Sequence, residues 1–138
     1  MLSGTLIHGT VPSRGMVSDW MLVATGGAIG ALLRYSISET WPSETLPWAT
    51  LTVNALGSLL LGLLTAALIA QSLSDQQALL LGMGLLGAFT TMSTFSVELV
   101  TLADQGRWGS AFGYMGATMV LCPLLAWFGW KGGQVLMT

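Results

Sequence analysis

A cluster of hydroxyl side chains inside a long apolar segment offers the most distinctive chemistry in this sequence. Glycines at positions 82, 84 and 87 precede the cluster, which comprises Thr90, Thr91, Ser93, Thr94 and Ser96. Glycine costs a helix about 1 kcal/mol relative to alanine, and hydroxyl side chains compete for backbone hydrogen bonds. Non-helical backbone at membrane depth persists only where protein buries it or where it lines a polar cavity. We therefore expect a broken helix here, with polar groups on the break that could hold an ion.

Two other sets of neutral polar side chains recur at every fourth position and so share one face of a helix. The first set is Thr50, Asn54 and Ser58, and the second is Ser110, Tyr114, Thr118 and Cys122. Each side chain could simply hydrogen-bond to a neighbouring helix or to a carbonyl one turn earlier. Together with the hydroxyl cluster, they favour a polar pathway for a small ion that forms strong hydrogen bonds. Two charges, Arg34 and Glu98, could belong to a vestibule or be ordinary interface charges, and they could also pair with each other.

The composition excludes most soluble and catalytic functions. The 138 residues are 53% hydrophobic and 7% charged, with a mean hydropathy of +0.73, whereas soluble domains carry about 25% charged residues. One cysteine and one histidine provide little for a metal centre or a catalytic triad. A net charge of −2 argues against nucleic-acid binding. We predict a membrane protein that is not an enzyme.

Four stretches are long and apolar enough to span a membrane, which takes about 20 residues. They cover approximately residues 18–38, 48–70, 77–102 and 108–136. We predict a polar leader over residues 1–17 and a single all-α domain of four transmembrane helices over 18–138, with the third helix broken. Several tryptophans near the span ends fit an interfacial aromatic belt: Trp20, Trp41, Trp48, Trp108 and Trp130.

Small residues three or four positions apart predict close packing between the helices. On the first span they are Gly26, Gly27, Gly30 and Ala31, on the second Ala55, Ser58 and Gly62, and on the fourth Gly109, Gly113, Gly116 and Ala117.

The basic residues do not favour either orientation in the membrane. With four spans, one side carries Arg14 and Lys131, and the other carries Arg107 together with Arg34. Because the two sides balance, the positive-inside rule gives no direction. This balance indicates insertion in both orientations and an antiparallel homodimer. The alternative is a single topology fixed by the leader or by the depth of Arg34.

Three segments resemble, in chain order, the motifs of one known family. Residues 26–35 (GGAIGALLRY) resemble GGxxGAxxRY, residues 50–57 (TLTVNALG) resemble TLxVNxxG, and residues 84–98 (GLLGAFTTMSTFSVE) resemble GxxGGxTTFSTFSxE. On these motifs the chain resembles the CrcB/Fluc family of fluoride channels over about residues 18–136.

The resemblance implies a passive, selective fluoride channel in the bacterial inner membrane, which lets fluoride leave the cytoplasm and lowers its toxicity. It implies a dual-topology antiparallel homodimer with two pores in the lipid bilayer. It also implies a structural sodium ion at the dimer centre, bound by backbone carbonyls at the positions of Gly87 and Thr90. The residues that match the fluoride pathway are Asn54, Met92, Ser93, Thr94, Phe95, Tyr114, Thr118 and Cys122. Arg34 and Glu98 match charged positions of the family.

Two positions depart from the family pattern. Met92 stands where the motif has its first phenylalanine, and Ala88 replaces the second glycine of a pair. Methionine lacks the positive ring edge with which an aromatic side chain can hold an anion. We expect Met92 to preserve the shape of the pore but to weaken anion stabilisation and slow conduction.

Two other functions fit four short spans. A small dual-topology, proton-coupled multidrug exporter needs a carboxylate within its first span, and residues 20–38 contain none. A non-transporting assembly protein would use its small residues only for packing. It would conduct no ion and would not need Asn54.

Overall fold

The computed structural model describes residues 13–41 and 45–137, with side chains from residue 18 onward. Within these residues every regular element is helical, and the helical segments form four candidate membrane spans. The elements are α1 (Ser13–Thr40), α2 (Trp48–Ile69), α3 (Asp75–Ala78), η1 (Leu79–Leu86), α4 (Gly87–Phe89), α5 (Met92–Asp104) and α6 (Trp108–Leu136). The predicted all-α fold with four spans is confirmed. Residues 1–12 of the predicted leader lie outside the described residues, and residues 13–17 form the start of α1.

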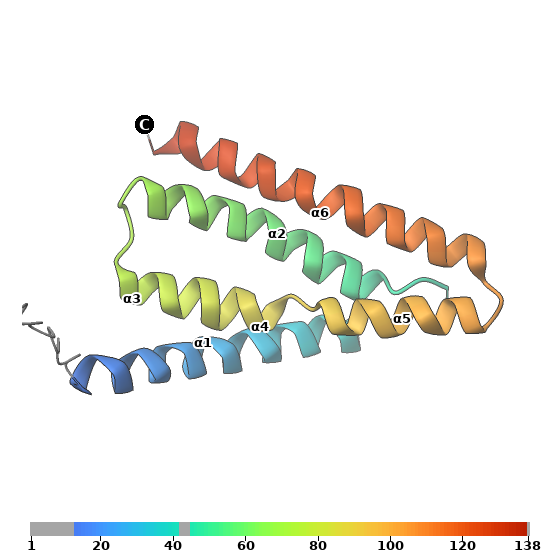
Figure 1. Cartoon of the computed structure of the whole chain (residues 1–138), viewed down its shortest axis with the longest axis horizontal. Coiled ribbons are helices and arrows are strands. Elements are labelled where there is room, and N and C mark those ends of the chain that lie inside the picture. The colour runs from blue at the N-terminus through green and yellow to red at the C-terminus, as the bar shows by residue number, and fades with distance from the viewer. Residues whose placement is uncertain (1–12, 42–44, 138) are drawn as a thin grey trace, which may run out of the picture.

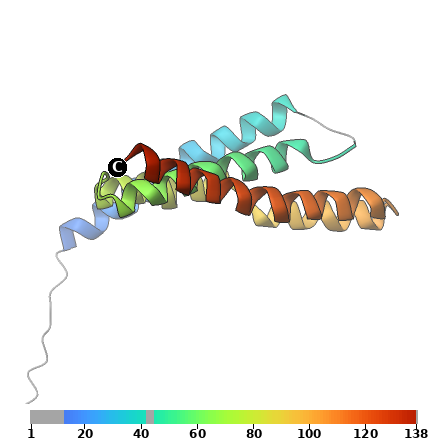
Figure 2. The same cartoon turned by 90° about the horizontal axis from the view of Figure 1, so that it is seen from above.

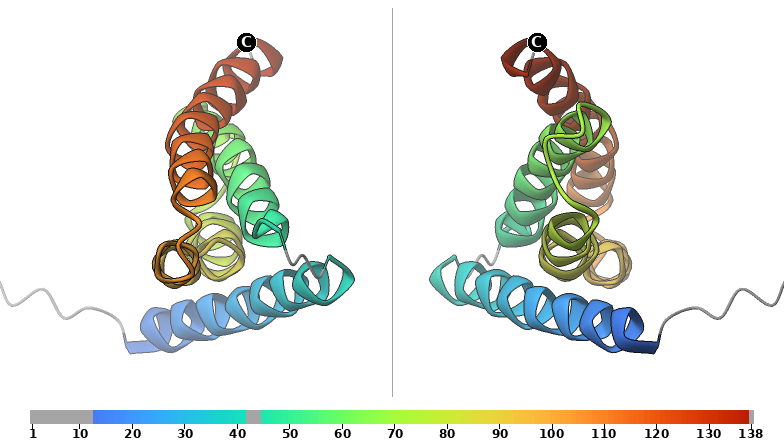
Figure 3. Two further views of the ribbon diagram at one scale, coloured as in Figure 1. Left: turned by 90° about the vertical axis from the view of Figure 1, so that its right-hand side faces the viewer. Right: turned by 90° about the vertical axis from the view of Figure 1, so that its left-hand side faces the viewer.

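In Figure 1 the long helices run roughly along the long axis of the molecule. In Figure 1, α6 lies along α2, and α3, η1, α4 and α5 follow one another almost in line on the other side of α2. The end-on views of Figure 3 show α1 crossing this line of short helices on the side away from α6. Seen from above in Figure 2, α1 runs obliquely to α5 and α6. The junction between α4 and α5 therefore lies near the middle of the molecule, and α3 lies at one end (Figure 1).

Glycines bring two pairs of helices into backbone contact. A Cβ atom on Gly30 would lie 2.1 Å from the Leu85 carbonyl oxygen, so α1 packs directly on η1. A Cβ atom on Gly62 would lie 2.1 Å from the Ala126 carbonyl oxygen, which fixes α2 against α6. These contacts agree with the small-residue faces predicted for the first two spans.

The small-residue face predicted for the fourth span makes no such contact within the chain. Positions 109, 113 and 116 would each carry a Cβ with no heavy atom within 4 Å. Instead α6 meets α2 through Gly129 and Gly133, where an added Cβ would lie 2.1 Å from the Leu59 carbonyl oxygen and 2.6 Å from the Ala66 Cβ. Spacing alone indicated a packing face but did not identify which half of α6 faces α2.

A π-helix leads into the centre of the molecule. The element η1 comprises eight residues, whereas most π-helical segments are single turns that often occur at functional sites. It follows α3, whose first turn is closed by a capping box between Ser74 and Gln77. Nothing in the residue pattern predicts this π-helix.

Candidate functional site

Two extended residues separate α4 from α5. Thr90 has φ −79° and ψ 156°, and Thr91 has φ −151° and ψ 114°. The Thr91 hydroxyl accepts a hydrogen bond from the Thr94 N–H at 3.2 Å and so caps α5. The Thr90 hydroxyl donates to the Leu86 carbonyl at 3.0 Å. The hydroxyl side chains therefore satisfy part of the backbone on both sides of the extended residues.

Asn54 pairs with the backbone of Thr91. Its Nδ2 donates to the Thr91 carbonyl at 3.0 Å, and its Oδ1 accepts from the Thr91 N–H at 2.8 Å. Both residues are buried, with 9% and 7% of their surface exposed. A primary amide has two N–H donors, so the bond to Thr91 leaves Asn54 one further donor. This side chain thus makes the interhelical bond that its sequence position allowed, and it makes it to the extended backbone.

The redirected hydrogen bonds leave two carbonyl groups without their helical donors. In a continuous α-helix, the N–H groups of Thr91 and Thr94 would serve the carbonyls of Gly87 and Thr90. Here the Thr91 N–H goes to Asn54 and the Thr94 N–H goes to the Thr91 hydroxyl. These two carbonyls are the ones that the family resemblance assigned to a cation.

Glu98 joins three helices. Thr50 of α2 donates to Oε1 at 2.7 Å, and Tyr114 of α6 donates to Oε2 at 2.7 Å. Thr50 and Tyr114 are 4% and 3% exposed, and Glu98 itself is partly buried. Hydrogen bonds to an ionised carboxylate are short and strong, so this cluster fixes α5 between α2 and α6. The sequence indicates these three residues separately but does not reveal their connection, because only the fold brings positions 50, 98 and 114 together.

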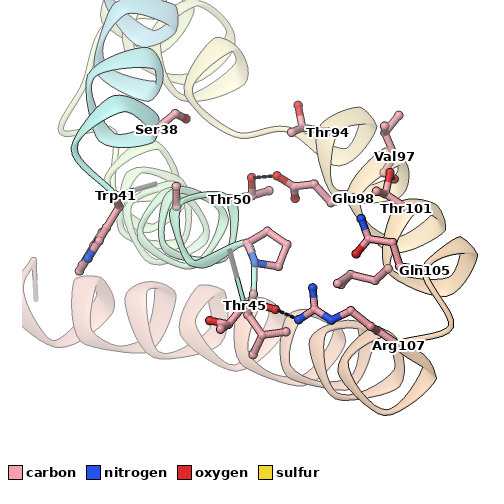
Figure 4. A pocket seen from close by; sticks show the side chains of 14 residues that line it. Ser38, Trp41, Thr45, Thr50, Thr94, Val97, Glu98, Thr101, Gln105 and Arg107 are labelled. Carbon is pink, nitrogen blue, oxygen red and sulfur yellow. Dashed lines mark hydrogen bonds between the residues drawn. The ribbon is translucent and has the colours of Figure 1, made fainter. Parts of the chain in front are cut away.

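A cavity of about 500 Å³ opens beside this cluster, and we call it the Glu98 cavity (Figure 4). Its polar lining includes Ser38, Thr50, Thr94, Glu98, Thr101, Gln105 and Arg107. Arg107 donates to the backbone carbonyl of Thr45, which ties the start of α6 to the segment before α2. The cavity therefore has a fixed cationic side chain at its outer edge and a carboxylate further in.

Arg34 lines a neighbouring cavity of about 190 Å³, the Arg34 cavity. The two cavities share Ser38, Thr50 and Thr94. Among the described residues, no ion pair joins Arg34 to Glu98, so the pairing that the sequence allowed does not form. The two charges face adjoining cavities instead, as a vestibule would require.

A third cavity, of about 240 Å³, lies beside Asn54 and is called the Asn54 cavity. It brings together four of the predicted pathway residues: Asn54, Met92, Thr118 and Cys122. It shares Thr91 with the Arg34 cavity. The three cavities thus follow one another from the Glu98 end of the molecule to its middle, and each shares lining residues with the next.

The other predicted pathway residues lie differently. Phe95 is 2% exposed, and its ring packs on Tyr114 with the centroids 5.0 Å apart. Ser93 lies next to the Thr91 hydroxyl, with 3.3 Å between their oxygens. None of these three residues lines the Asn54 cavity, whereas Met92 does and is 61% exposed in the single chain.

The chain is similar to known proteins over most of its length. The family model described as CrcB-like protein, Camphor Resistance (CrcB), matches residues 21–130. A protein of Thermus thermophilus, named fluoride-specific ion channel FluC, is 42% identical over 125 residues, which cover 88% of this chain and 98% of that protein. The protein of the same name from Idiomarina loihiensis is 48% identical over 110 residues, covering 78% of this chain and 85% of that protein. Its counterpart from Magnetococcus marinus is 44% identical over 119 residues, covering 83% and 96%.

Proposed function

This chain belongs to the CrcB-like protein family, and we propose that it is a passive, selective fluoride channel of the bacterial inner membrane. It is a multi-pass transport protein and not an enzyme. In this role it lets fluoride leave the cytoplasm and so lowers the toxicity of the ion. The observation that carries the proposal is the Asn54 cavity, where neutral polar groups from α2, α6 and the extended residues meet at membrane depth.

Neutral donors suit the passage of fluoride. The ion forms strong hydrogen bonds with water, so a route through the membrane must replace those bonds with bonds to the protein. The amide hydrogen of Asn54 that is not bonded to Thr91 supplies such a donor. The Thr118 hydroxyl does not, because it donates to the Tyr114 carbonyl at 2.9 Å. Among the described residues, no cationic side chain lines the Asn54 cavity, so an anion there is held by hydrogen bonds that it can leave again. Arg34 and Arg107 sit further out, where they attract anions to the entrance.

Glu98 has a positioning role in this scheme. Its carboxylate binds the hydroxyls of Thr50 and Tyr114 at once, which orients both side chains at the inner end of the Glu98 cavity. Tyr114 in turn supports the ring of Phe95. Tyr114 and Phe95 are thus held beside this carboxylate, whereas Ser93 and Thr94 lie at the Thr91 hydroxyl.

A sodium ion would be held by the backbone carbonyls of Gly87 and Thr90, contributed twice in an antiparallel homodimer. Hard cations prefer oxygen ligands, and both carbonyls have lost their helical donors to Asn54 and the Thr91 hydroxyl. No group of three or more His, Cys, Asp or Glu side chains among the described residues offers another metal site. The ion would balance the partial negative charge of the converging carbonyls and take no part in transport.

Two features support the homodimer. The basic residues balance between the two sides of the membrane, and a Cβ atom added at glycines 109, 113 or 116 of α6 would lie more than 4 Å from any heavy atom of the described residues. Close approach of a second subunit needs small residues of this kind.

Fluoride efflux from liposomes that contain the purified protein tests the proposed function. We expect rapid fluoride efflux and no measurable chloride efflux under the same gradient. Equal efflux of both ions, or efflux of neither, would contradict the proposal. The alternative of a proton-coupled multidrug exporter is not favoured, because the carboxylate nearest the pathway, Glu98, lies on the third span and is engaged by two hydroxyls.

A further inference from the structure

The series of cavities continues past Asn54 toward the other end of the bundle. A fourth cavity, of about 420 Å³, lies along α2 and α6 and shares Ser58 and Leu61 with the Asn54 cavity. Trp130 forms part of its wall, and we call it the Trp130 cavity. Positions 54, 58 and 62 of α2 lie on one helix face and extend over about 12 Å. The same face of α2 therefore lines both cavities.

Trp130 differs from the other tryptophans of the chain. Those at positions 20, 41, 48, 108 and 127 are 47–72% exposed, whereas Trp130 is only partly exposed. Its backbone nitrogen lies 2.9 Å from the place that a Cβ on Gly62 would take. Gly62 is about 10 Å along the helix from the end of α2 at Ile69, so the backbone of Trp130 packs against α2 well before that helix ends.

The indole nitrogen of Trp130 has no hydrogen-bond acceptor. Nε1 is covered by atoms of this chain and bonds to none of the described residues. An indole N–H is a donor only, and the hydrocarbon region of a membrane supplies no acceptor. The hydrogen-bonding capacity of this indole N–H is therefore unused among the described residues.

A second open donor lies on the shared wall. Among the described residues, no hydrogen bond is formed by the Ser58 hydroxyl, which lines both cavities. By contrast, Thr65 on the same helix donates to the Leu61 carbonyl at 2.7 Å. Ser58 is thus available to a ligand in a way that Thr65 is not.

The nearest charge favours an anion. The Lys131 ammonium lies 5.2 Å from the centroid of the Trp130 ring and donates to Gln134 at 3.1 Å. A cation over the ring is attracted to its π electrons and draws electron density from it, which makes the N–H a stronger donor. No carboxylate of the part of the chain that the structure describes lines the Trp130 cavity.

We infer that the Trp130 cavity is a second anion site, in which the Ser58 hydroxyl and the Trp130 indole N–H bind a small hydrogen-bonding anion of the fluoride type. The inference rests on the proposed function and extends the route beyond Asn54. Because Nε1 is covered by this chain, binding of the anion requires the indole ring to turn toward the cavity that it lines. The site thus provides a place for the ion between the Asn54 cavity and the Lys131 end of α6.

The test combines a spectroscopic measurement with a flux measurement. The full-length protein, labelled with ¹⁵N in its indole groups, is titrated with sodium fluoride or sodium chloride at constant ionic strength. We expect fluoride to shift the Trp130 indole N–H resonance and chloride to leave it in place. In liposomes, Trp130→Phe keeps an aromatic ring but removes the donor, and fluoride efflux should fall about tenfold, as for the loss of one hydrogen bond to a charged group. The matched control is Trp108→Phe, an exposed tryptophan at the other end of α6 that lines none of the four cavities, and its efflux should equal that of the unmodified protein.

The outcomes separate this inference from the proposed function. An unmodified protein that conducts fluoride while its Trp130 resonance ignores the ion overturns the second site alone. A loss of flux in Trp130→Phe without a fluoride-dependent shift in the unmodified protein assigns Trp130 a purely structural role and also overturns it. If Trp130→Phe fails to fold, the titration of the unmodified protein decides. An unmodified protein that conducts no fluoride overturns the proposed function and the second site together.

Discussion

Replacement of Asn54 should destabilise the protein through the backbone of Thr91. The amide makes two hydrogen bonds to this residue, at 3.0 and 2.8 Å, and Asn54→Leu removes both while keeping a side chain of similar volume. Interhelical hydrogen bonds in membrane proteins contribute about 0.6 kcal/mol on average and at most about 1.7 kcal/mol. Two such bonds correspond to about 1–3 kcal/mol. We expect the upper part of this range, because an extended backbone cannot recover its bonds within a helix.

The assay is the free energy of unfolding in detergent, measured by titration with a denaturing detergent. Thr65→Ala on the same helix serves as the control, because its hydroxyl bonds only to its own helix and its loss should leave stability unchanged. Asn54→Ala adds a cavity to the loss of the two bonds and should destabilise the protein further than Asn54→Leu. If Asn54→Leu unfolds with the free energy of the unmodified protein, the amide does not hold the extended residues. The same variant should also lose fluoride efflux, since the pathway donor goes with the side chain.

Two further predictions concern Glu98 and Met92. Glu98→Gln should lower the free energy of unfolding by about 1 kcal/mol, because a hydrogen bond to a neutral acceptor is weaker than one to a charged acceptor. In a double-mutant cycle with Tyr114→Phe, the two losses of stability should not be additive. Additive losses would show that the 2.7 Å contact between Tyr114 and Glu98 contributes no coupling energy. Met92→Phe should raise fluoride efflux from liposomes, because it places a ring edge with partial positive charge at the Asn54 cavity. A lower rate with phenylalanine would contradict the role assigned to this position.

The spans follow directly from composition, because apolar length is what a bilayer selects. The fourth span is predicted at 108–136, and α6 has the same bounds. The first span is predicted to start at residue 18, which is also the start of the candidate span Ser18–Thr40, although the helix α1 itself begins five residues earlier, at Ser13. A π-helix such as η1 differs from an α-helix in its backbone hydrogen-bond partners and not in the types of residue that it contains, so composition does not reveal it.

The site is predicted less completely than the spans. Repetition at every fourth position identifies Thr50, Asn54 and Ser58 as one polar face, and the structure shows that each has a different environment: a carboxylate, an extended backbone, and no partner among the described residues. Such differences depend on which residues from distant segments lie opposite each of these side chains, and the packing of the helices determines this. The importance of Trp130 is hidden for the same reason, because its neighbour Gly62 lies far away in the chain.

The bonds between Asn54 and Thr91 also bear on how the chain enters the membrane during synthesis. The ribosome delivers α2 before the segment that contains Thr91, so the amide is already within the bilayer when the extended residues arrive. Unpaired backbone groups in hydrocarbon cost several kcal/mol each. Because α2 already offers the Asn54 amide, the Thr91 N–H and carbonyl can form hydrogen bonds before the rest of the bundle has assembled. Glu98, by contrast, takes one partner from α2 and one from α6. Because one of these partners lies on the last helix, the Glu98 cluster forms only after α6 is in place.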